Sequence, residues 1–230
     1  MTMNTPSFWK PLRWLTMACA AGAFLLTACT PSQSTNAGQA SAAQPTPTEL
    51  AAAPVINGQP MAYALFAGGC FWCIEADFEK LADVLAVESG YTAGQTPQPT
   101  YAQVSAGRTG HTEAVRVLYD PSQVSYAQLV DYFWRHIDPT VKDQQFCDVG
   151  PQYRSGIYWQ NEAERAIAEA SRDALIRSGR FSTIHTELAP SSAFYLAEEY
   201  HQDYYKKNEL RYRYYRLSCG RDARVKKLWG

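Results

Sequence analysis

A cysteine between glycines and aromatic residues is the part of this 230-residue sequence best suited to chemistry. Gly68 and Gly69 precede Cys70, and Phe71 and Trp72 follow it. Two glycines permit a sharp turn and a close backbone approach by a ligand. Because Cys70 stands where a strand pattern changes to a helical one, free backbone N–H groups should lower its pKa. The segment therefore predicts a nucleophilic thiolate, although an inert buried cysteine between core aromatics fits the same residues.

Three further cysteines, Cys73, Cys147 and Cys219, lie after Cys70. Four cysteines in an oxidising compartment commonly form two structural disulfides, but a domain of this length has enough core without them. Cys70 and Cys73 also match the CxxC pattern of a thioredoxin-like disulfide oxidoreductase, which would not depend on Glu113. A structural zinc site is a weaker alternative, because Cys147 and Cys219 each stand alone in the sequence.

The elements that must position these residues follow from the spacing of apolar side chains. Residues 62–67 are an apolar run closed by glycines, which predicts a buried strand, and residues 71–81 have helical spacing. Further strands are expected at residues 84–89, 112–119, 155–159 and 184–188. Helices are expected at residues 126–137 and at residues 194–207. A further helix is expected to begin at Asn161, because Asn161 and Glu164 have the spacing of a capping box. Residues 138–153 read as a loop. Interleaved strands and helices predict a layered α/β or α+β fold.

The first sixty residues do not fit a folded domain. Residues 1–28 combine Lys10 and Arg13 with an apolar run too short to span a bilayer comfortably, which is typical of a signal peptide. The end of this run at Cys29 resembles a bacterial lipobox, whose cysteine carries the lipid; ordinary cleavage would leave Cys29 as a spare thiol. Residues 29–60 hold Glu49 as their one charge, which predicts a flexible tether before a domain at residues 61–230.

The charge pattern gives no case for nucleic-acid binding, since the formal net charge is -1. Basic residues do gather near the C-terminus, where we expect a solvated rim: Arg211, Arg213, Arg216, Arg221, Arg224, Lys226 and Lys227. The N-terminal pattern predicts a periplasm-facing lipoprotein of the bacterial cell envelope, placed at the outer membrane and held there by its lipid alone. The protein is expected to be a monomer. A lipoprotein that only binds a partner is a third alternative, and it predicts that the role survives Cys70→Ser.

Four short motifs resemble, in order and at similar separations, the A-type peptide methionine sulfoxide reductase family. They are Gly69-Cys70-Phe71-Trp72, Gly110-His111-Thr112-Glu113-Ala114-Val115, Gln152-Tyr153-Arg154-Ser155 and Tyr200-His201-Gln202. Each motif alone is weak, but four in order are very specific. The resemblance covers about residues 64–204. It implies an α+β fold, a two-layer α/β sandwich around a mixed sheet with a ferredoxin-like core and extra helices.

The resemblance also implies an activity, the reduction of methionine-S-sulfoxide in proteins and as the free amino acid. No bound cofactor or metal is implied, and a thioredoxin-like dithiol supplies the electrons. The implied roles are nucleophile for Cys70, methyl-group contact for Phe71 and Trp72, proton donor for Glu113, oxygen binding for Tyr101 and Tyr153, and site lining for Asp148. The chemistry suits these residue types, because a sulfoxide loses its oxygen only when a donor protonates it during thiolate attack. Burial would raise the pKa of Glu113 for that purpose.

Each of these residues also has a plain structural interpretation. Glu113 alone fits an outward residue on an alternating strand, and Tyr101 and Tyr153 fit ordinary packing. His111 and His201 are expected to be hydrogen-bonded structural residues. The tyrosine-rich segment at residues 195–215 is expected to pack rather than to bind a cofactor.

The thiol that recycles oxidised Cys70 is predicted in the order Cys219, Cys147, Cys73. Many family members keep a resolving cysteine in the C-terminal tail, which favours Cys219, although its neighbours are not the usual glycine-rich tail. Cys147 stands where many members have asparagine and Cys73 where many have glycine. A Cys70–Cys73 bond is expected to be strained, and two of the three cysteines could form a structural disulfide instead.

Overall fold

The computed structural model describes residues 52–230. The predicted signal peptide, Cys29 and most of the predicted tether lie outside these residues. The end of the predicted tether carries two short exposed strands, β1 (Val55–Ile56) and β2 (Gln59–Pro60), which pair with each other. Within residues 52–230 no helix is long and apolar enough to cross a membrane.

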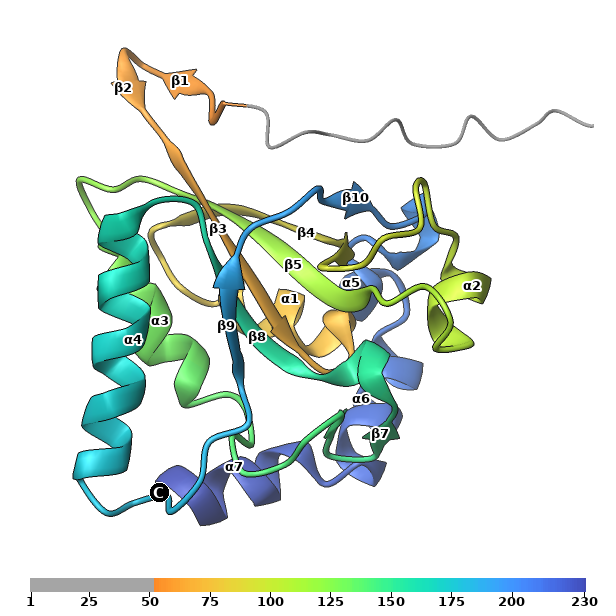
Figure 1. The fold of residues 1–230 in the computed structure, drawn as a ribbon. Helices are drawn as coiled ribbons and strands as arrows, with labels where there is room; N and C mark the ends of the chain where they lie inside the picture. Colours follow the sequence, from red (N-terminus) through yellow and green to blue (C-terminus); the bar gives the residue numbers. More distant parts are fainter. Residues whose placement is uncertain (1–51) are drawn as a thin grey trace, which may run out of the picture. The chain divides into compact units, whose positions relative to one another are not determined.

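A six-stranded mixed sheet organises the domain (Figure 1). Its order is β10-β4-β5-β3-β8-β9, and all neighbours are antiparallel except β8 and β9. The strands are β3 (Ala62–Gly68), β4 (Val84–Thr92), β5 (Thr112–Tyr119), β8 (Ser155–Trp159), β9 (Glu187–Pro190) and β10 (Tyr195–Leu196).

The four central strands and two helices follow one another as β3-α1-β4-β5-α3-β8. With the spatial order β4-β5-β3-β8, this is the ferredoxin-like arrangement. The predicted α+β fold with a ferredoxin-like core is confirmed.

Three helices cover one face of the sheet: α1 (Phe71–Phe78), α3 (Tyr126–Trp134) and α4 (Glu162–Arg177). Successive side chains of β3 point to opposite faces of the sheet, so Phe66 points into this layer, where its ring centroid lies 4.9 Å from that of Phe78 and 5.0 Å from that of Phe133. Asn161 caps α4 by accepting the backbone N–H of Glu164, as predicted. The contact between Phe66 and Phe78 packs α1 against the sheet, and with it the segment that carries Cys70.

The helix predicted at residues 194–207 is wrong. The segment forms β10, a 3-10 turn η2 (Glu199–His201) and a short helix α5 (Tyr204–Lys207). Gln202 explains the difference, because its side chain accepts the Ser89 N–H and donates to the Ser89 carbonyl, both at 2.9 Å. These tertiary bonds hold the chain against the sheet edge and outweigh its helical spacing.

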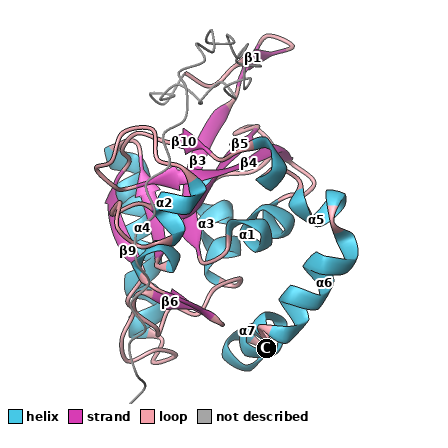
Figure 2. Cartoon of the chain, turned by 90° about the vertical axis from the view of Figure 1, so that its right-hand side faces the viewer, coloured by secondary structure: helices cyan, strands magenta, loops and turns pink. Residues whose placement is uncertain are grey.

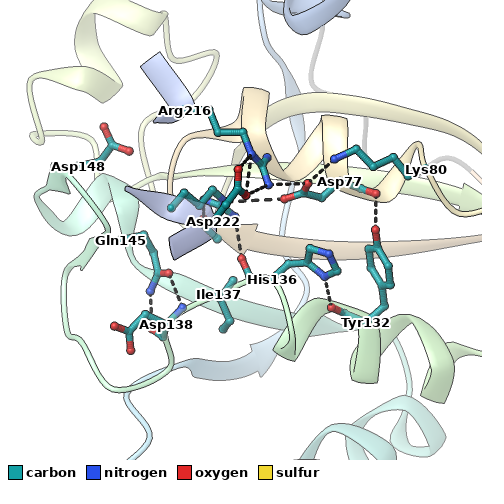
Figure 3. A network of polar contacts seen from close by, with 12 residues as sticks. Asp77, Lys80, Tyr132, His136, Ile137, Asp138, Gln145, Asp148, Arg216 and Asp222 are labelled. Carbon is teal, nitrogen blue, oxygen red and sulfur yellow. Dashed lines mark hydrogen bonds and ion pairs between the residues drawn. The ribbon is translucent and has the colours of Figure 1, made fainter. Parts of the chain in front are cut away.

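Two C-terminal helices, α6 (Glu209–Ser218) and α7 (Arg221–Trp229), were not predicted, and α6 runs beside α1 at some distance from the sheet (Figure 2). The basic residues here do not all form a solvated rim. Arg221 is 2% exposed and donates to the carbonyls of Gly68 and His136. Arg216 reaches Asp77 at 2.9 Å and Asp222 at 2.6 Å (Figure 3). The buried Asp77 carboxylate compensates these guanidinium charges, which is why they can leave solvent.

Candidate active site

Cys70 lies where β3 turns into α1, as its sequence context predicts. Gly69 makes this turn with φ +82°, and a side chain there would come within 2.5 Å of Gln145. Cys70 is the N-cap residue of α1, and Cys73 follows one turn later on the same helix. The sequence thus brings a sulfur to the start of a helix through a turn that only glycine fits.

A cavity of about 70 Å³ surrounds the Cys70 side chain. The residues around it come from six separate elements: Cys70, Phe71, Trp72, Tyr101, Glu113, Asp148, Tyr153 and Tyr215. Tyr101 begins α2 (Tyr101–Ser105), Asp148 begins β7 (Asp148–Val149), and Tyr153 ends the 3-10 turn η1 (Pro151–Tyr153). Every residue predicted for catalysis or substrate binding therefore lies in this one cavity.

Glu113 is buried on β5, so the alternative of an outward strand residue does not hold. Its carboxyl oxygen accepts the backbone N–H of Phe71 at 3.0 Å. Burial raises the pKa of Glu113 to about 8 despite this hydrogen bond. A carboxyl group that stays protonated at neutral pH is a proton donor.

The predicted low pKa of Cys70 is wrong. Burial raises the pKa of the Cys70 thiol well above its usual range, and the hydrogen bond to Cys73 and the charges of Glu113 and Asp148 act in the same direction. The helix start cannot offset this desolvation, since Cys70 is only 6% exposed. In contrast, the hydrogen bond from Cys70 lowers the pKa of Cys73 to about 7, helped by the charges of Arg221 and Arg216.

The Trp72 indole is held by aromatic neighbours and by His201. Its ring stacks on Tyr204 with centroids 3.7 Å apart, and its N–H donates to Nδ1 of His201 at 3.0 Å. Burial lowers the pKa of His201 to about 4, which keeps the ring neutral and able to accept that bond. His111 lies away from the cavity and holds a loop, since its Nδ1 accepts the Gly94 N–H at 3.2 Å. Both histidines are structural, as expected from the sequence.

A tight hairpin brings Asp148 to the cavity. β6 (Gln144–Gln145) pairs with β7, and Gln145 faces Asp148 across the two-residue turn formed by Phe146 and Cys147. The side chain of Gln145 is fully buried and bonds both the N–H and the carbonyl of Asp138. The hairpin is therefore anchored from within, although the sequence predicted only a loop here.

The three candidate resolving cysteines separate into two groups. Cys147 is bonded to Cys219, with their Cα atoms 4.9 Å apart, while Cys70 and Cys73 are free. Cys73 is 2% exposed and is hydrogen-bonded to Cys70. Within residues 52–230, one group of three or more possible metal ligands occurs, Cys147, Asp148 and Cys219, and its two sulfurs are already joined. Among these described residues, Cys70 and Cys73 belong to no such group.

Tyr215 is a site residue that no sequence motif indicates. It comes from α6, and its hydroxyl donates to Oδ2 of Asp148 at 2.6 Å. Its ring meets the Trp72 ring edge-on at 5.9 Å. The neighbouring Tyr204 and Tyr212 do pack, as expected of this segment. No local pattern distinguishes Tyr215 from them, because its role arises from the hairpin that lies opposite.

Comparison with known proteins agrees with this geometry. Residues 62–230 match the peptide methionine sulfoxide reductase family. Peptide methionine sulfoxide reductase MsrA 2 of Caulobacter vibrioides is 48% identical over 180 residues, which cover 78% of this chain and 91% of that protein. The MsrA protein of Halalkalibacterium halodurans is 48% identical over 168 residues, covering 73% of this chain and 96% of that protein.

Solved structures show the same fold. Methionine sulfoxide reductase A of Corynebacterium diphtheriae superimposes with a TM-score of 0.60 at 36% identity, covering 67% of this chain and 79% of that chain. Reduced Mxr1 from Saccharomyces cerevisiae gives a TM-score of 0.61 at 30% identity, covering 68% of this chain and 90% of that chain. With the cavity around Cys70, these matches show that the chain belongs to the peptide methionine sulfoxide reductase family, in its A-type branch.

Proposed function

We propose that this peptide methionine sulfoxide reductase reduces methionine-S-sulfoxide by attack of Cys70 on the sulfoxide sulfur, with Glu113 as the acid. The observation that carries the proposal is the burial of both groups in one small cavity. The bond from the Phe71 N–H at 3.0 Å holds the Glu113 carboxyl beside the turn that carries Cys70. Nucleophile and acid can then reach the two ends of one S–O bond.

Cys70 has to lose its proton before it attacks, and Cys73 is placed to accept it. The two thiols share a hydrogen bond, and the pKa of Cys73 is lowered to about 7. When the proton moves to Cys73, the Cys70 thiolate bonds to the substrate sulfur while Glu113 protonates the oxygen. The hydroxyl passes to the Cys70 sulfur, and the substrate leaves as methionine. Cys70 is thereby oxidised to a sulfenic acid and the sulfoxide is reduced.

The remaining cavity residues bind the substrate on two chemically different sides. Burial raises the pKa of Tyr101 to about 12 and raises that of Tyr153 as well, so both hydroxyls stay protonated and can donate to the sulfoxide oxygen. Phe71 and Trp72 supply the apolar surface for the methyl group. An oxygen site and a methyl site around one chiral sulfur favour a single epimer.

Cys73 is the best-placed thiol to recycle Cys70. Its sulfur attacks the sulfenic acid, water leaves, and a Cys70–Cys73 disulfide forms, which an external thioredoxin-like dithiol then reduces. The sequence favours Cys219, but Cys219 is paired with Cys147. Contact with Cys70 therefore favours Cys73 in this role.

The location of the enzyme is part of the proposal. The signal pattern and Cys29 support a lipid-anchored, periplasm-facing enzyme of the cell envelope, with oxidised envelope proteins as its substrates. Processing at Cys29 would be checked by the mass of the mature chain purified from membranes.

Racemic methionine sulfoxide in a peptide, with excess dithiothreitol, tests the proposed function. Conversion is expected to stop near half, leaving the R epimer, because only one epimer fits the oxygen and methyl sites together. Chiral chromatography of the residual sulfoxide measures this. Formation of no methionine, with reduction of a disulfide substrate instead, would replace the proposal with the CxxC oxidoreductase alternative.

Replacing Tyr215 with phenylalanine is expected to lower kcat/KM about tenfold, mainly through KM. The change removes a hydrogen bond to a carboxylate, and such bonds contribute about 1.5–3 kcal/mol. Tyr214→Phe is the matched control, since Tyr214 is 75% exposed and its hydroxyl lies outside the cavity. Steady-state kinetics on an oxidised peptide would compare the two variants, and equal effects would remove Tyr215 from the substrate site.

A further inference from the structure

Two cross-links join the β6–β7 hairpin to α6, one polar and one covalent. The polar one is the hydrogen bond from Tyr215 to Asp148, at 2.6 Å. The covalent one is the Cys147–Cys219 disulfide. Figure 1 shows β7 beside α6, and the disulfide joins the turn just before β7 to the C-cap residue of α6.

The two cross-links are neighbours at both of their ends. Cys147 precedes Asp148 directly on the hairpin, and Cys219 follows Tyr215 by four residues, one helical turn, on the same side of α6. The sulfur of Cys147 lies 3.8 Å from Oδ1 of Asp148. Movement of the hairpin at Cys147 would therefore be transmitted to the Asp148 carboxylate.

Both partners of the polar cross-link line the cavity around Cys70. The remainder of the hairpin is fixed by the buried Gln145, so its turn is the part that a further restraint can still affect. The hydroxyl of Tyr215 holds one carboxylate oxygen of Asp148, and the other faces the disulfide. The wall of the substrate cavity thus depends on the distance between hairpin and α6.

We infer that the Cys147–Cys219 disulfide is a positioning cross-link that holds Asp148 and Tyr215 in the substrate-binding geometry, and that it takes no part in recycling Cys70. The inference rests on the proposed function, in which Cys73 resolves the sulfenic acid. An external dithiol supplies the two electrons and two protons that convert the Cys147–Cys219 disulfide to two thiols. This removes the covalent link between hairpin and α6 and leaves the hydrogen bond from Tyr215 to Asp148 as the weaker link. Substrate binding then weakens, whereas attack by Cys70 on bound substrate is unchanged.

Single-turnover reduction of an oxidised peptide, without dithiol, tests the inference on the full chain. The disulfide is either left intact or opened with a phosphine that is removed before mixing, and its state is read from the mass after thiol alkylation. Opening it is expected to raise the half-saturating peptide concentration about tenfold with the maximal rate unchanged. The Cys147→Ser/Cys219→Ser double variant should match the opened wild type and should not respond to the phosphine.

A double-mutant cycle with Tyr215→Phe separates positioning from general loosening of the fold. Because both changes act through Asp148, the combined variant is expected to lose about tenfold in binding, whereas independent effects would give about hundredfold. The number of methionines formed per chain is a second readout, expected to stay at one after the disulfide is opened.

Three results would overturn the inference: an unchanged half-saturating concentration, a hundredfold combined loss, or two methionines per opened chain. The last result would make Cys147 and Cys219 a second redox pair that reduces the Cys70–Cys73 disulfide. Failure of the proposed function has a different signature, since no methionine would then form in either state of the disulfide.

Discussion

Cys70→Ser is expected to abolish methionine formation, with a loss on the order of 10⁴-fold or more in rate. A serine hydroxyl in this cavity has no base strong enough to ionise it, so the sulfoxide sulfur meets no nucleophile. Single-turnover chromatography of methionine released from an oxidised peptide measures the loss. Turnover of the serine variant at a rate within tenfold of wild type would remove Cys70 as the nucleophile.

Cys73→Ser is expected to behave differently from Cys70→Ser. This variant keeps Cys70 and is expected to form one methionine per chain, more slowly, because the group that accepts the Cys70 proton is gone. Its Cys70 should remain a sulfenic acid that a dimedone reagent labels, whereas the wild type ends as a Cys70–Cys73 disulfide. A wild-type chain that labels equally well would show that Cys73 is not the resolving thiol.

Glu113→Gln is expected to slow sulfoxide reduction by about 10²–10⁴-fold, the usual contribution of a positioned general acid. Glutamine keeps the hydrogen bond from the Phe71 N–H but has no proton to give to the oxygen. Peptide binding should change little, because the size and shape of the side chain are preserved. An undiminished single-turnover rate would exclude Glu113 as the acid.

The pH profile gives this prediction a second signature. Glu113 is active when protonated and its pKa is raised to about 8, so the wild-type single-turnover rate should fall as pH rises through about 8. Cys73 accepts a proton only as the thiolate, so the rate should rise through its pKa of about 7. A bell-shaped profile follows, and Glu113→Gln should lose the falling limb while keeping the rising one.

Glu75→Gln is the matched control for this experiment. Glu75, on α1, is buried like Glu113, and burial also raises the pKa of Glu75 to about 8. Glu75 does not line the cavity. Its side chain accepts the Asp203 N–H at 3.1 Å, a bond that glutamine can keep. Rate and pH profile should match the wild type, whereas a loss of the falling limb would place the titration outside the active site.

Much of the fold could be predicted because its elements carry local periodicity. The strand before Cys70 and the helix after it follow from apolar spacing between glycines, and the cap at Asn161 follows from a four-residue pattern. The helix expected at residues 194–207 failed because Gln202 bonds to Ser89 on a distant strand. Bonds of that kind have no trace in the local sequence.

Some active-site residues could likewise be predicted from local motifs, and others could not. Glu113 and Asp148 were found because they lie in or near motifs, and burial then gave Glu113 the raised pKa that the chemistry needs. Tyr215 was missed, because its partner lies 67 residues away on a hairpin that the sequence did not predict. The raised pKa of Cys70 does not follow from the sequence, because helix position is local information, whereas desolvation depends on the whole cavity.

The small size of the cavity decides which damaged residues the enzyme can serve. The cavity of about 70 Å³ suits the methyl sulfoxide end of one side chain but not the peptide chain that bears it. A client protein must therefore extend an oxidised methionine away from its own surface. Oxidised residues inside a folded client wait for local unfolding, so their repair rate reports the client's opening free energy. The repair rate of a client protein therefore depends on the flexibility of that protein as well as on its chemistry.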